Sequence, residues 1–209
     1  MADQAFIGKE PGPIYRWYVL LLLFAIYSMN IADRQILGIL AEDIKRDLAL
    51  SDSEIGLLAG PVISFFYAIL GVPMAYAADR LNRVRFVTVC LMLWSVFTML
   101  GGVAQNLWHL AATRLGVSVA EAGGTPTSSS LIADYFPQGN RATAMAIYSS
   151  GATAGIFIAY ALGGFVSSTY GWRNAVFLAG VPGILLAMLM ILTVREPVRG
   201  AAEGIATPA

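Results

Sequence analysis

Four ionisable residues lie inside stretches of the sequence that are otherwise apolar. Asp33 and Arg34 separate two uncharged runs, residues 17–32 and 36–41, and Arg114 and Glu121 lie within residues 107–135. A charge at the centre of a bilayer costs roughly 2.5–3.5 kcal/mol on insertion scales, so such residues face a partner charge or a water-filled cavity. Carboxylates in such places can exchange protons, and arginines can bind carboxylates through paired hydrogen bonds.

The spacing of these residues predicts which of them meet. Arg34 lies seven residues before the expected helix end at Ala41, and Arg114 lies seven residues after the expected start at Leu107. With a rise of about 1.5 Å per residue, both lie roughly 10 Å below the same membrane surface, which predicts an Asp33–Arg114 ion pair.

Glu121 follows Arg114 by two helical turns, so it shares that face about 10 Å deeper. It has no partner at its own depth unless Arg34 reaches down to it. Burial and a nearby arginine act on this carboxylate in opposite senses, which makes Glu121 the candidate for reversible proton exchange. The alternative for all four residues is a buried ion-pair network that only fixes helix packing.

Composition indicates the class of protein in which these four charges occur. The chain has 209 residues, of which 57% are hydrophobic and 12% charged, and its mean hydropathy is +0.68. These values predict an integral membrane protein and exclude water-soluble classes. The apolar segments are too long and too uniform for barrel strands, so we expect six transmembrane helices, at residues 15–41, 55–78, 86–103, 107–135, 142–166 and 175–194.

Small residues and flanking charges organise these segments. Gly151 and Gly155 form a small-xxx-small face that allows close helix packing. We expect a flexible tail at 1–14, the six-helix bundle at 15–194, and the start of a cytoplasmic linker at 195–209. Positive charge predicts that both termini are cytoplasmic, in an inner or plasma membrane. The inner side would hold Lys9, Arg16, Arg80, Arg83, Arg85, Arg141, Arg195 and Arg199, against Lys45, Arg46 and Arg173 outside.

Enzymatic and metal-binding functions find little support in the sequence. The chain has one cysteine, Cys90, and one histidine, His109, with no metal-ligand spacing and no phosphate-binding loop. We therefore expect no cofactor and no enzyme, and zero net charge suggests no nucleic-acid partner. An intramembrane enzyme using His109 and Glu121 is disfavoured, because these residues would lie some 20 Å apart along one helix.

A charged turn carries a family resemblance. The stretch "AYAADRLNRVRF" resembles the signature Gly-x-x-x-Asp-Arg-x-Gly-Arg-Arg of the major facilitator superfamily. Asp79, Arg80, Arg83 and Arg85 fit its charge pattern, while Ala75, Asn82 and Val84 depart from it. Residues 30–58, 113–145 and 171–187 are similar to the first, fourth and sixth helices of spinster-like transporters.

The resemblance implies an all-α membrane protein whose six helices form two inverted three-helix repeats, half of a twelve-helix fold. It implies a secondary transporter that works by alternating access. The solute would be lipid-like or another small organic molecule, and proton coupling is expected. The related anion-transporter families suggest sugar acids or other carboxylates instead, with Arg34 and Arg114 as clamps. A non-transporting protein with structural ion pairs is the remaining alternative.

The resemblance also implies residue roles. Asp33 and Glu121, with Arg34 and Arg114 beside them, would form the substrate and proton-coupling site. A cytoplasmic gating network would consist of Asp79, Arg80, Arg83, Asp134 and Arg141, with Asp134 near Arg80 or Arg83. For Asp134 and Arg141, helix-end capping is an equal alternative. The partner would be a missing second half or a second copy of the chain, and the tail sequence favours a fragment of a longer transporter.

Overall fold

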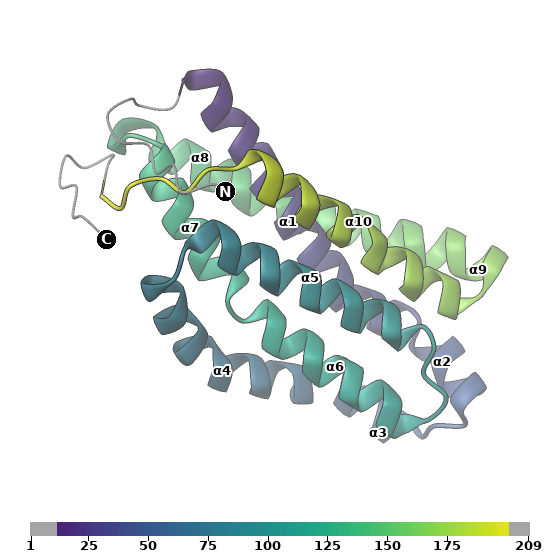
Figure 1. Cartoon of the computed structure of the whole chain (residues 1–209). Coiled ribbons are helices and arrows are strands. Elements are labelled where there is room, and N and C mark those ends of the chain that lie inside the picture. Colours follow the sequence, from purple (N-terminus) through teal and green to yellow (C-terminus); the bar gives the residue numbers. More distant parts are fainter. Residues whose placement is uncertain (1–11, 201–209) are drawn as a thin grey trace.

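The computed structural model describes residues 12–200, and every regular element in this range is a helix. The long helices lie side by side in one bundle (Figure 1). In chain order the elements are α1 (Pro13–Ile39), α2 (Ala41–Leu48), α3 (Asp52–Ala59), α4 (Pro61–Arg80), α5 (Arg83–Gly101), α6 (Leu107–Glu121), α7 (Gly124–Tyr135), α8 (Gln138–Tyr160), a π-helical turn (Ala161–Val166), α9 (Ser167–Tyr170) and α10 (Trp172–Thr193). All six predicted apolar segments fall on helices. Most of the predicted tail and residues 201–209 lie outside the described residues.

Length and apolar composition agree with a membrane location. Five helical stretches of the described chain are long and apolar enough to cross a membrane. They are Pro13–Ile39, Asp52–Arg80, Arg83–Gly101, Gln138–Tyr170 and Trp172–Thr193. The remaining predicted crossing, residues 107–135, is made by two shorter helices, α6 and α7.

Two predicted helices are interrupted. The second segment was expected to continue through Pro61, but it breaks at Gly60, where φ is −140° and ψ is −77°. Pro61 has no N–H to donate to the preceding turn, so it suits the first position of α4. The fourth segment breaks after Glu121, and α7 begins at Gly124.

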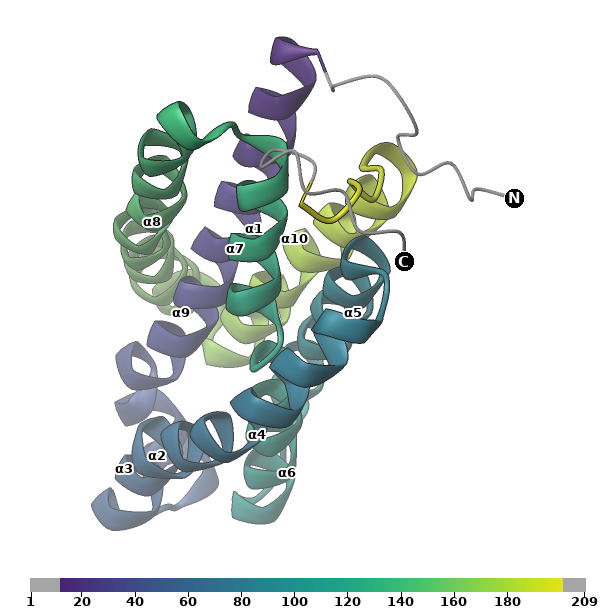
Figure 2. The same cartoon turned by 90° about the vertical axis from the view of Figure 1, so that its left-hand side faces the viewer.

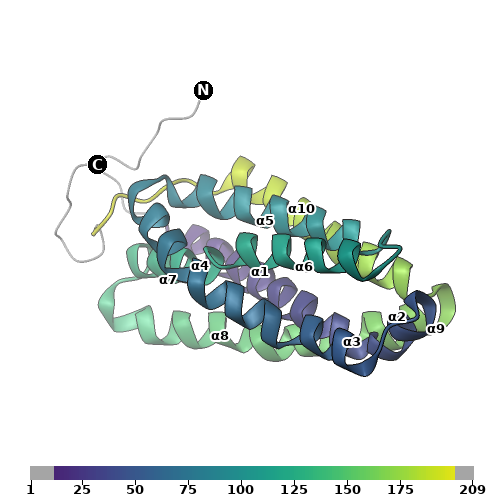
Figure 3. The same cartoon turned by 90° about the horizontal axis from the view of Figure 1, so that it is seen from below.

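The helices are arranged in an order that differs from the chain order. Helix α1 lies between α8 and α10, and α5 packs on the far side of α10 (Figure 3). Helix α7 contacts α1, α5 and α8 at the end of the bundle nearer the described chain termini (Figure 2). Helix α6 packs on α5 and α4, and thereby brings Arg114 and Glu121 toward the middle of the bundle.

Glycines allow two close helix contacts, of which the small-xxx-small pattern predicted the one at Gly155 but not the one at Gly180. A Cβ atom at Gly155 of α8 would lie 2.4 Å from the carbonyl oxygen of Ser28 in α1. A Cβ atom at Gly180 of α10 would lie 2.6 Å from the carbonyl oxygen of Ser95 in α5. No larger residue fits at either place without moving a backbone, so α1 pairs closely with α8, and α5 with α10.

The apolar core has two parts, one toward each end of the bundle. One part includes residues 19–26 of α1, and the other includes Ile36, Leu37 and Leu40. Asp33 and Arg34 lie on α1 between these two parts. The apolar clusters therefore flank the charged residues from both ends and limit the access of water along the bundle axis.

The charged turn between α4 and α5 is shorter than predicted. Only Leu81 and Asn82 connect the helices, so Asp79 and Arg80 end α4 and Arg83 begins α5. The Asn82 side chain accepts a hydrogen bond of 2.9 Å from the backbone N–H of Arg85 and so caps α5. This cap is a physical reason for asparagine at a position where the superfamily signature has glycine.

At the opposite end of the bundle, α2 is held against the start of α10. The Asp47 carboxylate accepts hydrogen bonds from Trp172 Nε1 (3.1 Å) and from the Arg173 guanidinium. The Asp43 carboxylate also accepts a hydrogen bond of 2.8 Å from the hydroxyl of Ser167 in α9. These polar contacts fix a helix that the hydrophobic pattern did not predict.

Candidate functional site

The four predicted charges meet as two ion pairs between α1 and α6. Arg114 Nη1 lies 3.6 Å from Asp33 Oδ2, and Arg34 Nε donates to Glu121 Oε2 at 2.8 Å. The predicted Asp33–Arg114 pair is thus confirmed, and Arg34 does reach the deeper Glu121. Asp33 and Arg34 are adjacent on α1, yet their partners Arg114 and Glu121 lie two turns apart on α6. The long side chain of Arg34 spans this difference in depth.

Burial separates Arg34 from the other three charges. Asp33, Arg114 and Glu121 are only 2%, 1% and 1% exposed, whereas the Arg34 side chain is 30% exposed. Asp33 also accepts a hydrogen bond of 2.8 Å from Thr98 of α5. Arg34 is therefore the member of the group that a solute can reach, and Arg114 is held inside.

Hydrogen bonding in this buried group is incomplete. Within residues 12–200, Asp33 Oδ2, Glu121 Oε1, and Arg114 Nε and Nη2 have no hydrogen-bond partner. A buried polar atom without a partner costs roughly 1–3 kcal/mol, so each of these atoms favours a further hydrogen-bond partner. The arrangement leaves capacity for a proton or a small polar ligand beside Glu121.

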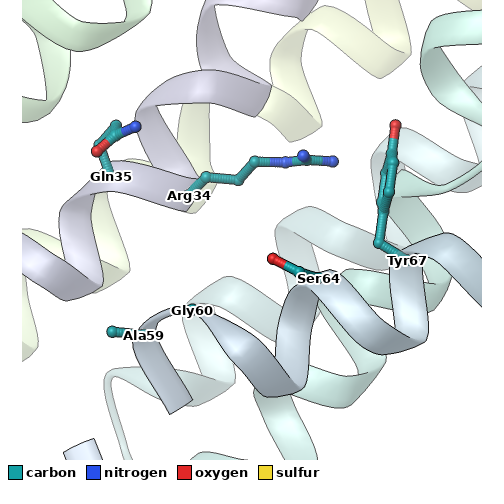
Figure 4. A pocket seen from close by; sticks show the side chains of 6 residues that line it. All are labelled: Arg34, Gln35, Ala59, Gly60, Ser64 and Tyr67. Atoms are coloured by element: carbon teal, nitrogen blue, oxygen red, sulfur yellow. The ribbon is translucent and has the colours of Figure 1, made fainter. Parts of the chain in front are cut away.

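A pocket opens onto this group at Arg34. It has a volume of about 260 Å³ and is lined by Arg34, Gln35, Ala59, Gly60, Ser64 and Tyr67. Figure 4 shows the Arg34 side chain extending toward Tyr67, while Gln35 points away. The guanidinium carbon of Arg34 lies 4.1 Å from the centroid of the Tyr67 ring. This cation–π contact fixes the guanidinium at the pocket while its Nε remains bound to Glu121.

Two predicted gating residues come together at the other candidate site. Arg83 Nη1 donates to Asp134 Oδ2 at 2.5 Å. Asp134 was predicted to lie near Arg80 or Arg83, and the partner is Arg83. Arg83 Nε donates to Glu196 Oε1 at 2.7 Å, and Glu196 Oε2 accepts the Val84 N–H at 2.9 Å. Arg83 is 2% exposed, so its charge is buried between two carboxylates.

The remaining predicted gating residues lie outside this contact. The guanidinium of Arg80 stacks on Tyr76 at 4.1 Å, and the exposed Asp79 carboxylate makes no ion pair within the described residues. Arg141 Nη2 donates to the carbonyl of Ala133 at 2.9 Å, which is the helix-end contact weighed as the alternative. Among residues 12–200, Arg83 and Asp134 are the members of the predicted gating set that form an ion pair with each other.

The segment that follows α10 was not predicted to take part in the site. We call residues 194–200 the strap. Its Arg199 guanidinium donates to the carbonyls of Ala78 (3.0 Å), Leu81 (2.9 Å) and Asp79 at the end of α4. The N–H of Gly200 donates to Asp134 Oδ1 at 3.0 Å. The strap therefore joins the ends of α4, α5 and α7.

Sequence reasoning missed Tyr67 and Glu196. Tyr67 lies in an uncharged segment, where only its phenol distinguishes it from core aromatics. Glu196 lies in a polar segment beyond the last helix, where one acid has no periodic pattern to mark it. Its position beside Arg83 depends on the chain folding back, and no local signal in the sequence reports that.

Comparison with known proteins extends the resemblance. The family model described as Major Facilitator Superfamily matches residues 23–208. An MFS-type efflux pump of Mycolicibacterium smegmatis is 36% identical over 197 residues, covering 92% of this chain and 46% of the relative. A probable galactarate/D-glucarate transporter of Bacillus subtilis is 30% identical over 196 residues, covering 91% of this chain and 42% of the relative.

A solved structure agrees with these relatives. It is the inward-facing, occupied crystal structure of a bacterial homolog of the human lysosomal transporter spinster. The match has a TM-score of 0.87 and 38% sequence identity, and covers 93% of this chain and 48% of that chain. The chain thus spans about half the length of the relatives that it matches.

Proposed function

Since the chain belongs to the Major Facilitator Superfamily, we propose that it forms one six-helix half of a secondary transporter for a small organic anion. The observation that carries this proposal is the position of Arg34. Its guanidinium lines the pocket, is bound by only one nitrogen to Glu121, and stacks on Tyr67. Membership of the family supports alternating access as the mode of transport.

A carboxylate is the solute group that suits Arg34 best. A guanidinium presents a flat set of donors that matches the two oxygens of a carboxylate, and the hydroxyl of Ser64 lines the same pocket. The similarity to a probable galactarate/D-glucarate transporter supports this class. Arg114 is buried against Asp33, so we assign it to positioning rather than to binding.

A lipid-like solute is the second candidate. The resemblance to spinster-like transporters, with 38% identity to a bacterial spinster homolog, favours it. An anionic amphiphile would still use Arg34 for its charged group. A neutral lipid would not, and this difference separates the two candidates by experiment.

Proton coupling is assigned to Glu121, with Asp33 as the second acid. Glu121 is 1% exposed, and among residues 12–200 it forms an ion pair with Arg34 alone. A carboxylate solute that binds Arg34 competes with Glu121 for the same cation. An unpaired buried charge is costly, so release of Arg34 favours protonation of Glu121 and links the two binding events.

The cytoplasmic gate is assigned to Asp79, Arg80, Arg83, Asp134 and Arg141. Arg83 and Asp134 are paired within this half, whereas the Asp79 carboxylate is exposed at the end of α4. An exposed acid at the bundle end is available to contact the rest of the transporter in one state of the cycle. Asp79 is therefore assigned to docking and Arg83 to holding the bundle end.

The orientation of the bundle in the membrane follows from the position of its basic residues. Both described ends of the chain and the α4–α5 turn lie at one end of the bundle (Figure 1), where the predicted inner arginines gather. This arrangement supports a cell-membrane protein with cytoplasmic termini. The other wall of the solute site would come from a further six helices or from a second copy.

The test compares two modes of transport in the transporter that contains this chain. Glu121→Gln should abolish uptake of labelled D-glucarate or a lipid-like anion against its gradient when a proton gradient drives it. Counterflow exchange should survive, because it needs no net proton movement. Glu42→Gln is the matched control, since Glu42 is 66% exposed on α2. Concentrative uptake that is unchanged in Glu121→Gln would rule out Glu121 as the coupling acid.

A double variant tests the structural alternative. If the charges only fix packing, Asp33→Asn with Glu121→Gln should keep every transport activity. If the charges serve transport, the double variant should lose concentrative uptake while the purified protein stays folded.

A further inference from the structure

Besides Tyr67, which contacts Arg34, two further tyrosines on α1 and α8 pack against each other. The proposed function gives no role to these two side chains. The rings of Tyr27 in α1 and Tyr148 in α8 are stacked, with centroids 4.7 Å apart and an interplanar angle of 24°. Tyr148 belongs to the same apolar cluster as Leu131 and Ile132 of α7. Helix α7 lies beside both α1 and α8 (Figure 2), so three helices hold this ring in place.

The two rings have different environments. Tyr148 is 3% exposed, and its ring is fixed by the stack with Tyr27 and by the surrounding apolar cluster. Tyr27 is half-buried and stacks on Tyr148, so part of its ring remains exposed. A flat ring backed by a second, fixed ring is a preformed surface for stacking, because little ordering is needed when a third ring binds.

Tyr27 shares a helix face with Arg34. The two residues are seven positions apart, which is two helical turns, so their side chains leave α1 on the same side about 10 Å apart along its axis. Both are partly exposed, whereas Ala32, on the opposite face of this stretch, is buried. A single solute can therefore contact a cation at one end and an aromatic face at the other.

We propose that Tyr27, backed by Tyr148, is a subsite for the flat unsaturated part of an organic anion whose carboxylate binds Arg34. This inference rests on the proposed function and narrows its substrate class to anions with an aromatic ring joined to the carboxylate through a short linker. A polyhydroxylated acid has no flat apolar face, so it gains nothing from this surface.

Packing alone is the competing account of the stack. The backbone of Gly151 approaches Tyr27 closely, since a Cβ atom there would lie 3.2 Å from Tyr27 Cδ1. If Tyr27 only fills the α1–α8 interface, its replacement lowers stability and leaves solute selectivity unchanged. The two accounts therefore differ in selectivity, and a matched pair of solutes can measure it.

The experiment uses 3-phenylpropionate and 3-cyclohexylpropionate, which share a carboxylate and a chain length and differ in the aromatic ring. Their dissociation constants are measured by titration calorimetry on the purified transporter that contains this chain. Tyr27→Leu should weaken phenylpropionate binding about 3- to 10-fold and change cyclohexylpropionate binding less than about twofold. Tyr27→Phe keeps the ring and should change neither. Tyr160→Leu, on an exposed face of α8, is the control for loss of a tyrosine elsewhere.

Other results would overturn either the aromatic subsite alone or the proposed anion transport as well. Equal weakening of both solutes, or no change in Tyr27→Leu, overturns the aromatic subsite. Binding of D-glucarate but of neither ring compound by the folded wild-type protein also overturns it, and leaves organic-anion transport intact. Binding of no anion at all by the folded protein overturns the proposed function itself.

Discussion

Replacing Glu196 with alanine should destabilise the bundle although this residue lies beyond the last helix. The carboxylate accepts from Arg83 Nε at 2.7 Å and from the Val84 N–H at 2.9 Å. A hydrogen bond that involves a charged group contributes roughly 1.5–3 kcal/mol. The Glu196 side chain is 19% exposed, so solvent screening favours the lower end of that range, and two such bonds give about 3 kcal/mol.

Thermal unfolding in detergent measures this loss. For a domain of this size, 1 kcal/mol shifts Tm by about 2–4 °C, so Glu196→Ala should lower Tm by about 6–12 °C. Glu196→Gln keeps one neutral acceptor and should lose about half as much. Glu42→Ala is the control, because Glu42 forms an exposed pair with Lys45 at 3.0 Å, and such pairs contribute about 0–1 kcal/mol.

A double-mutant cycle tests whether the loss of stability in Glu196→Ala arises from the contact with Arg83. Arg83→Met removes the buried cation, so Glu196→Ala should cost much less in that background than in the wild type. Equal costs in both backgrounds would show that the Glu196–Arg83 contact does not stabilise the fold. A Glu196→Ala effect no larger than that of Glu42→Ala would refute the argument from burial.

Three further predictions concern other parts of the molecule. Gly155→Ala should destabilise the α1–α8 contact by about 1–3 kcal/mol in chemical unfolding, because its Cβ would lie 2.4 Å from a backbone oxygen of α1, while Gly139→Ala, with open space around it, should not destabilise. Arg34→Lys should weaken carboxylate binding about tenfold in a solute titration, because a lysine cannot form two parallel hydrogen bonds to one carboxylate, and an unchanged affinity would contradict the role of Arg34. Hydrogen bonds from Arg173 hold the pKa of Asp47 below its ordinary value, so the contribution of this contact is present above the unfolded pKa of about 3.9 and is lost as pH falls further. The hydrogen-exchange protection factors of residues 41–48, which are corrected for the intrinsic effect of pH on exchange, should therefore fall on acidification, and Asp47→Asn should remove that fall.

The helix content and the central charges could be predicted because each depends on local pattern. Uncharged runs near 20 residues indicate membrane helices, and equal distances from the helix ends placed Asp33 and Arg114 at one depth. The rise per residue gives depth but not side-chain reach, so the Arg34–Glu121 contact stayed conditional until the structure showed it at 2.8 Å.

The interruptions and the strap could not be predicted in the same way. Hydropathy continues through Gly60 and through residues 122–123, and neighbouring helices in a membrane protein often keep a proline-containing helix continuous. Which outcome applies depends on tertiary contacts. The contact of Glu196 with Arg83 joins residues 113 positions apart, so it is a property of the folded chain.

The strap also decides where a longer polypeptide would be anchored mechanically. Helix α10 ends at Thr193, but the bonds of Glu196, Arg199 and Gly200 fasten the chain to the ends of α4, α5 and α7. A tether counted from residue 200 is six residues shorter than one counted from residue 194, about 20 Å less in reach. A pull on that tether would load the end of α4, which carries Asp79 and Arg80, before it loads α10, so tension in a connecting segment would act directly on the proposed gate.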